Sequence, residues 1–343
     1  MRDMLKLKES AKNKRNKSKV VLLFIIFELV FTAVTAPFVL YYGPFKNIKT
    51  IVVGSAMTTL TLQRLVTSFI SDEKIKQIMS DQKIESITQD NVDGVNGIKV
   101  EHKNDNTIER YDLTSKKFKG YILVIKDPTR IKVGFASMPY KSGELTSEIA
   151  RDNRAIAAIN GGAFSNKHSE LPSIEKGTSP AGIIMSDGKI IFNNIENDDE
   201  TNEVIALTKS GKLLVGRHSI SEMKTASVEE AVSFGPALIV NGIKAITTGD
   251  GGWGIAPRTA IAQRKDGTII FIVIDGRRIN SFGATLRELQ DELYKFGAYN
   301  AANLDGGSSS TLFYNDEVIN NPCGKLGERK VPSIIYVEKE RKE

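Results

Sequence analysis

The feature that most constrains this chain is an apolar run near its start. Val20 to Tyr42 gives 23 residues with a single charge, Glu28. At about 1.5 Å per residue, a helix of this length roughly spans the hydrocarbon core of a bilayer. Residues 1–19 hold eight Lys or Arg and two acids, so the positive-inside rule places this tail in the cytoplasm and the rest of the chain outside. We therefore expect a single-pass membrane anchor.

Two alternatives to one uncleaved span remain open. A signal peptide has a shorter apolar region, of about 7 to 15 residues, followed by a small-residue cleavage site, and Thr35–Pro44 offers no convincing one. The stretch Thr50–Leu62 is short for a second span, and we interpret residues 45–80 as an amphipathic stalk helix. The expected organisation is a cytoplasmic tail (1–19), an anchor (20–42), a stalk and linker (43–107) and a globular domain (108–343).

The charge of the chain argues against nucleic acid as a partner. The formal net charge of +6 lies in the tail, because residues 20–343 carry 39 basic and 39 acidic side chains. Binding to phosphate backbones needs a clustered basic excess, which the neutral remainder lacks. A single cysteine, Cys323, also excludes an intrachain disulfide framework.

The globular part is patterned as strands joined by tight turns. Apolar runs flank Asp187-Gly188, Ser210-Gly211, Asn241-Gly242 and Asp266-Gly267. Asn-Gly and Asp-Gly pairs tolerate the positive φ angles that hairpin turns need. The fold class we expect is α+β: an N-terminal transmembrane helix and a stalk helix, then a single domain of mixed, mostly antiparallel β-sheet with flanking helices.

One segment departs from the hairpin pattern. Thr268–Asp275 is typical of a buried strand, Thr285 to Glu288 forms a capping box that opens a helix, and Gly297 ends that helix before Ala298–Leu304 resumes as a strand. The segment is therefore a βαβ unit if its two strands run parallel in one sheet.

This unit brings two acids to one edge of the sheet. Asp275 and Asp305 end the two strands, and ligands favour the carboxyl edge of such sheets. Pairing Gln263 with Thr268 across the hairpin also brings Arg258 and Thr259 opposite the end of the strand that carries Asp275. An arginine is thus predicted beside two carboxylates.

Glycine-rich turns follow strands at the same place. Asn160 precedes Gly161-Gly162, and Asp305 precedes Gly306-Gly307-Ser308-Ser309. Consecutive glycines let the backbone turn sharply and can aim several N–H groups at an anion. The loop Asp250–Gly254 carries Trp253, whose ring could stack on a sugar.

These segments resemble the phosphodiester glycosidase domain family, which includes bacterial members associated with exopolysaccharide. The resemblance covers about residues 120–338 and rests on six motifs in the family's order. They are Asn160–Phe164, Phe234–Leu238, Pro257–Thr259, Val273–Arg277, Gly283–Leu289 and Asn303–Ser308.

The resemblance implies hydrolysis of the bond between the anomeric carbon of a sugar and a phosphodiester. Asp275 and Asp305 would supply the nucleophile or base and an electrostatic partner for the transition state, with their roles interchangeable at this stage. Asn160 would orient a sugar hydroxyl or the attacking water. The remaining expected substrate-binding residues are Arg258, Thr259, Gly161, Gly162, Gly306, Gly307, Ser308, Ser309, Arg277 and Trp253.

The sequence requires no cofactor, although two carboxylates could hold a divalent cation. The expected partners are a sugar-1-phosphodiester or a phosphate-containing glycopolymer, and the membrane through residues 20–42. The location implied is the cell membrane, with the catalytic domain extracytoplasmic and acting on envelope glycopolymers or exopolysaccharide. Three alternatives remain. One is a serine hydrolase that uses Ser308, Ser309 or Ser310, which the scarcity of histidine disfavours. The others are a non-catalytic carbohydrate-binding or assembly protein of the envelope and a phosphosugar transferase that uses the same site.

Overall fold

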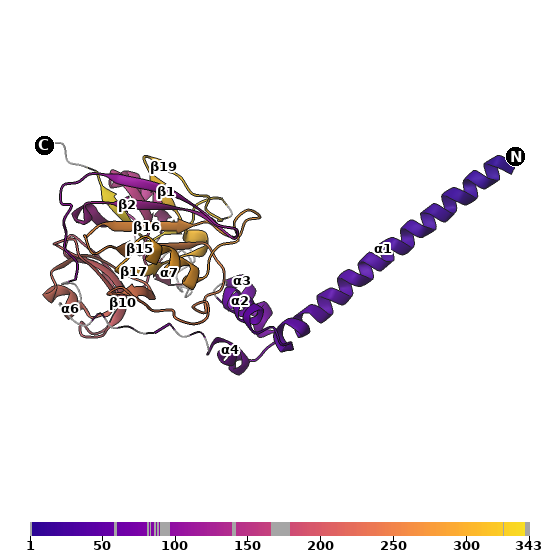
Figure 1. Ribbon diagram of the computed structural model, residues 1–343, viewed down its shortest axis with the longest axis horizontal. Coiled ribbons are helices and arrows are strands. Elements are labelled where there is room, and N and C mark those ends of the chain that lie inside the picture. Colours follow the sequence, from indigo (N-terminus) through magenta and orange to yellow (C-terminus); the bar gives the residue numbers. More distant parts are fainter. Residues whose placement is uncertain are drawn as a thin grey trace. The chain divides into compact units, whose positions relative to one another are not determined.

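The structure is a computed structural model that describes two compact units. It covers residues 2–339 apart from 58–59, 81, 83, 86, 88, 90–96, 139–141, 166–178 and 325. The units are Met1–Met79 and Ser80–Glu343 (Figure 1).

The first unit is helical. Its helices are α1 (Arg2–Tyr42), α2 (Lys46–Met57), α3 (Leu60–Thr67) and α4 (Asp72–Met79). Among the described residues, Lys17–Tyr42 of α1 is the one helix with the length and apolar composition to cross a bilayer. The stretch expected as one stalk helix instead forms three short helices. The break before α4 has a local cause, since Ser71 accepts a hydrogen bond from the amide of Lys74 and so caps a new helix.

The second unit is built around a seven-stranded sheet in which every pair of neighbours is antiparallel. Its strands in spatial order are β1 (Ile108–Thr114), β2 (Lys119–Ile125), β16 (Ile269–Ile274), β15 (Arg258–Gln263), β17 (Asn300–Leu304), β13 (Ala237–Val240) and β14 (Ile243–Lys244). The predicted hairpins at Asn241-Gly242 and Asp266-Gly267 are present as β13–β14 and β15–β16. The register of the second differs by one residue, because Gln263 pairs with Ile269 rather than Thr268.

The strand, helix, strand unit is confirmed. Helix α7 (Leu286–Lys295) begins at Thr285, whose hydroxyl accepts from the amide of Glu288 while the Glu288 carboxylate accepts from the amide of Thr285. Gly297 follows the helix with φ +83°, a conformation that favours glycine. Strands β16 and β17 flank β15 and are antiparallel to it. They are therefore parallel to each other, with one strand between them.

Two five-stranded sheets complete the domain. One contains β11 (Leu213–His218), β10 (Asn202–Thr208), β12 (Val228–Ser233), β8 (Ile183–Ser186) and β9 (Lys189–Asn193). The other contains β19 (Glu317–Val318), β18 (Leu312–Tyr314), β5 (Ala155–Asn160), β21 (Ser333–Glu338) and β3 (Ile131–Phe135). The smaller elements are β4 (Glu144–Leu145) with β20 (Lys330–Val331), β6 (Phe164–Ser165) with β7 (Ser179–Pro180), α5 (Thr146–Asp152), α6 (Ile220–Thr225), and the 3-10 turns Pro128–Arg130 and Gly307–Ser309.

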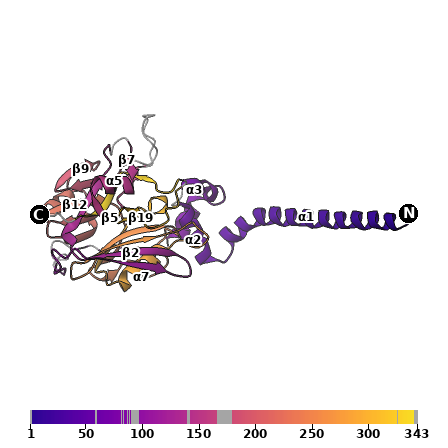
Figure 2. The same cartoon turned by 90° about the horizontal axis from the view of Figure 1, so that it is seen from above.

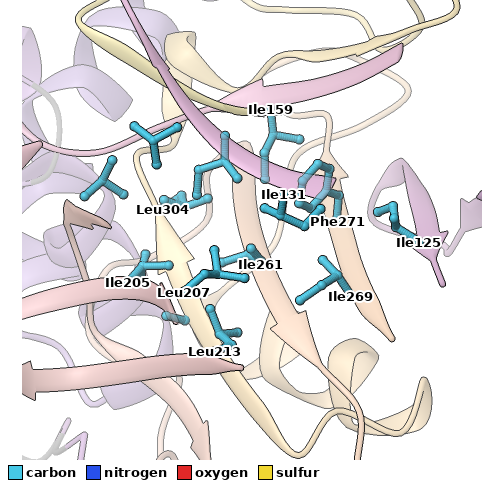
Figure 3. Close-up of a cluster of buried hydrophobic side chains, with 14 of the residues drawn as sticks. Ile125, Ile131, Ile159, Ile205, Leu207, Leu213, Ile261, Ile269, Phe271 and Leu304 are labelled. Atoms are coloured by element: carbon cyan, nitrogen blue, oxygen red, sulfur yellow. The ribbon is translucent and has the colours of Figure 1, made fainter. Parts of the chain in front are cut away.

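The core lies on both faces of the seven-stranded sheet. One face packs against the two five-stranded sheets through residues such as Ile159, Ile205 and Ile261 (Figure 3). The other face packs against α7 through Leu286 and Leu289, and Figure 2 shows α7 and β5 on opposite sides of β2. Each fully buried aliphatic side chain contributes about 1.5 to 3 kcal/mol. Since both faces are filled, chemistry in this domain is confined to the strand ends and loops.

The segment before β1 also packs on the domain. The amide of Glu85 donates to the carbonyl of Ala245, and Gln89 is buried with its side-chain oxygen accepting from the amide of Val215. These contacts agree with the division of the chain between Met79 and Ser80.

Candidate active site

The two predicted acids lie at one edge of the seven-stranded sheet. Asp275 directly follows β16 and Asp305 directly follows β17. With β15 between them, the two strands are about 10 Å apart, from about 4.8 Å per neighbouring pair. Thr259 pairs with Leu304 and Arg258 with Ile274, so all four predicted residues occupy the same end of three adjacent strands. Their side chains, however, have different environments.

Asp305 is the less satisfied of the two acids. Its Oδ2 is buried and has no hydrogen-bond partner within the described part of the chain. Burial raises the pKa of this carboxyl to about 6, against the opposing effects of the nearby Ser309 hydroxyl, the Arg329 charge and the Gly306 amide. A carboxyl with a pKa this close to neutral can exchange a proton at the pH of most cells.

Asp275 is held by an asparagine from another segment. Its Oδ1 accepts hydrogen bonds from Asn320 Nδ2 at 3.0 Å and from the amide of Asn321 at 2.9 Å. Asn320 Nδ2 also donates to the carbonyl of Ser310, so it joins the loop after β16 to the loop after β17. Because one oxygen of Asp275 accepts both bonds, this carboxylate fixes the loop after β16 to the segment at Asn320 and Asn321.

Asn160, at the end of β5, is fully buried. Its Nδ2 donates to the carbonyl of Asp305 at 2.6 Å, and its Oδ1 accepts from Thr259 Oγ1 at 2.8 Å and the amide of Thr311 at 3.2 Å. The asparagine thus fixes the end of β17 against two neighbouring segments. This arrangement differs from the expected role of orienting a sugar hydroxyl or water, because both the nitrogen and the oxygen of the amide already bond protein groups.

The glycine turns do not form the expected anion nest. The amide of Gly161 donates to the carbonyl of Ser333, and that of Gly162 donates to Ser333 Oγ. The amide of Gly307 donates to the carbonyl of Pro257, and that of Gly306 is directed to the Asp305 carboxylate. These glycines are needed for close approach instead, since a Cβ on Gly161 would lie 2.8 Å from the Ser333 carbonyl.

Hydroxyl groups follow Asp305 in an unbroken series. The side-chain oxygens of Ser309, Ser310 and Thr311 are buried and have no hydrogen-bond partner among the described residues, while Ser308 is half-buried. Buried polar atoms are nearly always paired with protein or ordered water. Ser309, whose hydroxyl also acts to lower the pKa of Asp305, and its two neighbours therefore indicate a segment that takes up water or a polar ligand.

Arg258 serves a different purpose from the one its register predicted. The side chain is 3% exposed, and its Nε and one Nη donate to the carbonyls of Ala284, Trp253 and Gly254. Burial lowers its pKa to about 10. The guanidinium therefore ties the loop around Trp253 to the start of α7, and Trp253 itself packs edge to face on Phe234 at 6.2 Å between ring centroids.

Two other arginines flank the turn after Asp305. Arg277 is exposed, and its backbone has a φ of +57°. Its two terminal nitrogens lie 3.3 and 3.4 Å from the position that a Cβ on Gly307 would occupy. Arg329 is half-buried, covers the ring of Phe164 at 4.1 Å, and its charge opposes the rise in the pKa of Asp305. Sequence reasoning missed Arg329, Asn320 and Asn321, because they lie in an irregular segment that carries none of the motifs.

The carboxylates do not gather into a metal site within the described ranges. No group of three or more His, Cys, Asp or Glu side chains there is arranged to hold a metal ion. A divalent cation between Asp275 and Asp305 would therefore find no third His, Cys, Asp or Glu ligand among the described residues.

Comparison with known proteins identifies the family and the fold. The sequence profile of the phosphodiester glycosidase family matches residues 153–338, more than half of the chain. The chain belongs to the phosphodiester glycosidase family. This confirms the resemblance seen in the six sequence motifs.

Two relatives and one solved structure give the range of similarity. The chain is 26% identical over 217 residues to bovine (Bos taurus) N-acetylglucosamine-1-phosphodiester alpha-N-acetylglucosaminidase, an alignment that covers 57% of this chain and 39% of that protein. It is 43% identical over 81 residues to the SPbeta prophage-derived uncharacterized protein YomE of Bacillus subtilis (strain 168), covering 24% and 12%. The chain thus spans well under half the length of either relative.

The fold agrees with that of a solved member of the family. The catalytic domain of zebrafish N-acetylglucosamine-1-phosphodiester alpha-N-acetylglucosaminidase, described as auto-inhibited by its pro-peptide, superposes with a TM-score of 0.58 at 22% identity, covering 71% of this chain and 87% of that one. The expected fold class, an N-terminal apolar helix followed by a domain of mostly antiparallel sheet, is therefore confirmed. The residues matched to the family include the whole of the site from Asn160 to Arg329.

Proposed function

We propose that this phosphodiester glycosidase family member hydrolyses sugar-1-phosphodiesters at the edge that carries Asp305. The products are a free sugar and a phosphomonoester. The single observation that carries the proposal is the Asp305 carboxyl, whose buried Oδ2 lacks a partner among the described residues and whose pKa is raised to about 6. At pH 7 most of this carboxyl is ionised and can take up a proton.

The reaction needs few groups because phosphate is a good leaving group. Water attacks the anomeric carbon, and the bond from that carbon to the phosphate oxygen breaks with its electron pair passing to the phosphate. The Asp305 carboxylate accepts the proton of the attacking water and stabilises positive charge on the sugar ring. The three hydroxyls from Ser309 to Thr311 would hold the water and the departing oxygen.

We assign the phosphate to Arg277 and Arg329 rather than to Arg258. The guanidinium of Arg277 lies near Gly307, and the charge of Arg329 acts on the Asp305 carboxyl. Arg258 holds the loop around Trp253 through backbone carbonyls. Arginine binds phosphate through charge-assisted hydrogen bonds. In this proposal Asp275 and Asn160 are positioning residues, and Arg258 and Trp253 shape the adjoining loop.

The location proposed is the cell membrane, with α1 as anchor and the glycosidase domain outside. The apolar window at Lys17–Tyr42 and the basic tail before it support this topology. Phosphate-containing envelope glycopolymers or exopolysaccharide are then the accessible substrates.

The deciding experiment measures sugar release by the full chain in detergent micelles. UDP-N-acetylglucosamine is a convenient sugar-1-phosphodiester, and Asp305→Asn should lower kcat by about 10²- to 10⁴-fold. Asp316→Asn is the matched control, since Asp316 is exposed in a turn of the same domain. Unchanged turnover in Asp305→Asn refutes the assignment of this residue. Sugar binding without release from several sugar-1-phosphodiesters favours a carbohydrate-binding protein instead, and transfer of the sugar to an added alcohol favours a transferase.

A further inference from the structure

A second group of unpaired acceptors lies beside the site and includes Glu203, which lies outside the six sequence motifs. Among the described residues, five buried carboxylate or amide oxygens lack a hydrogen-bond partner, on Glu203, Asn241, Asp250, Asn303 and Asp305. These oxygens cannot donate, so each needs a donor from water or a ligand. Three of the five gather at one end of the domain.

Glu203 and Asn303 meet at Gly235. A Cβ on Gly235 would lie 2.8 Å from Glu203 Oε2, so the missing side chain is what leaves room for this carboxylate. Asn303 Nδ2 donates to the carbonyl of Gly235 at 3.0 Å, which leaves Asn303 Oδ1 as the unpaired atom. The two unpaired oxygens therefore flank a single residue of the backbone.

The place is continuous with the proposed catalytic edge. Asn303 is 1% exposed and stands two residues before Asp305 on β17 and its extension, a separation of about 6.6 Å along a strand. The amide of Ala163, which follows the turn at Gly161-Gly162, donates to the carbonyl of Ser233 just before Phe234. A pyranose ring can bridge the distance of about 6.6 Å between Asn303 and Asp305.

The chemistry of the place suits a sugar ring. Glu203 shares a face of β10 with Ile205 and Leu207, so its carboxylate is held at the end of an apolar layer. Phe234, the residue before Gly235, packs edge to face on Trp253. Sugars present hydroxyl donors around the ring and apolar C–H faces, which match unpaired acceptors next to aromatic rings.

We propose that Glu203 and Asn303 form the sugar subsite, with Glu203 Oε2 and Asn303 Oδ1 accepting hydrogen bonds from two hydroxyls of the sugar whose anomeric carbon faces Asp305. This subsite rests on the proposed function and adds to it the residues that select the sugar. Burial raises the pKa of Glu203, while the charge of Arg217 and the amide of Ala237 oppose that rise. A hydroxyl donor from the sugar would replace the solvation that this carboxylate loses.

The test compares Glu203→Gln and Asn303→Ala with the matched control Glu200→Gln in the full chain in detergent. Glu200 is exposed in the segment before β10. With UDP-N-acetylglucosamine, Glu203→Gln should raise KM about tenfold or more while kcat changes much less. The same comparison uses a set of UDP-sugars that each lack one hydroxyl. One of these analogues should already have a raised KM with the wild type, and Glu203→Gln should not raise the KM for that analogue further.

Other outcomes separate this inference from the proposed function. If wild-type turnover is present and Glu203→Gln keeps the KM and the pattern of losses across the deoxy sugars, the acceptors bind only water and the subsite is refuted. If no substrate is turned over, the proposed function fails, and saturation-transfer NMR with free N-acetylglucosamine tests the subsite directly. Binding that Glu203→Gln weakens supports it, and absence of binding overturns it. The kinetics of Asn303→Ala are used only if its thermal midpoint matches that of the wild type. If it does not, the result for Glu203→Gln, which retains the shape of the side chain, decides the test.

Discussion

Asn160 Nδ2 donates a 2.6 Å hydrogen bond to the backbone carbonyl of Asp305 and so joins the last residue of β5 to the residue after β17. The two strands belong to different sheets. The position of the Asp305 carboxyl therefore depends on a contact between sheets and not on its own strand alone. A buried side-chain amide that bonds three segments is an economical way to fix one carboxylate, since each bond is shielded from water.

Replacing Asn160 should lower both stability and activity. Asn160→Ala leaves the hydroxyl of Thr259 and the amide of Thr311 without their partner, so we expect a loss of about 1 to 3 kcal/mol in the free energy of unfolding. Because Asp305 also loses its support, kcat should fall more than KM rises. Urea unfolding followed by the fluorescence of Trp253, the single tryptophan of the chain, measures the first effect.

Thr259→Val is the graded companion to this change. It removes one of the three contacts and keeps the shape, so its cost should be smaller, about 1 kcal/mol. Equal losses in the two variants would show that Asn160 is not the centre of the network.

The raised pKa of Asp305 predicts a particular dependence on pH. The folded carboxyl has a pKa of about 6 against a reference value of 3.8, so the folded state holds the proton more tightly than the unfolded state does. This residue therefore lowers stability as pH rises from about 4 to about 6, and its effect is constant above that. Asp305→Asn should be more stable than the wild type by about 2 to 3 kcal/mol at pH 7.5, and the advantage should shrink towards pH 4.

The activity profile checks the same group independently. If the ionised carboxylate accepts the proton of water, kcat/KM should increase with pH along a limb whose apparent pKa is near 6. A profile that decreases through this range would instead assign Asp305 as an acid.

The arginines of the site should separate by role. Arg258 is buried and bonded to three carbonyls, so Arg258→Met leaves those carbonyls unpaired and should cost about 3 kcal/mol or more. Arg277 is exposed, so Arg277→Gln should cost less unfolding free energy than Arg258→Met does and should raise KM for a phosphodiester substrate. An aryl glycoside without phosphate is the control, because its KM should not respond to Arg277→Gln.

Much of the fold follows from the sequence because its signals are local. The Asn-Gly and Asp-Gly turns, the capping box at Thr285 and the glycine at 297 each act within a few residues, and each gave the element expected from it. The helices after α1 were harder to divide, since an apolar pattern of helical spacing does not mark where a chain leaves one helix and caps the next. The register error at Gln263 has a similar origin. The predicted loop has four residues (264–267) and the observed loop has five (264–268), and the Asp-Gly pair is compatible with either length.

The site was harder to predict because its contacts come from distant segments. Topology brought Asp275, Asp305, Arg258 and Thr259 to one edge, as the motifs implied. The sequence could not indicate that Asn320 would donate a hydrogen bond to Asp275, or that Arg258 would donate to backbone carbonyls. It also could not indicate that the charge of Arg329 would act on Asp305. These outcomes depend on side-chain direction and on loops without a motif, and neither has a period that a pattern could reveal.

The double glycine after Asn160 should tolerate no side chain. A Cβ on Gly161 would lie within 2.8 Å of the carbonyl carbon and oxygen of Ser333, which are backbone atoms of β21 that cannot move without breaking the sheet. Gly161→Ala should therefore cost about 2 to 3 kcal/mol, as overpacking in a core does. Gly188→Ala is the control, because Gly188 has open space around it and a φ of +73°, so only backbone strain of about 1 kcal/mol is expected. Chemical unfolding of both variants checks the difference, and equal costs would contradict the close approach of β5 and β21.

The apolar helix predicts how the chain partitions in a cell. If Lys17–Tyr42 remains as an anchor, the 37.7 kDa chain should stay in the membrane pellet after alkaline carbonate extraction. With the orientation that the positive-inside rule predicts, protease added outside should digest the domain and spare the basic tail. Neutralising Lys14, Arg15, Lys17 and Lys19 should weaken this orientation, whereas neutralising Lys209 and Lys212 on the domain should not. A shorter, soluble product would show instead that the helix acts as a cleaved signal sequence, and the glycosidase domain would then be released rather than held at the membrane.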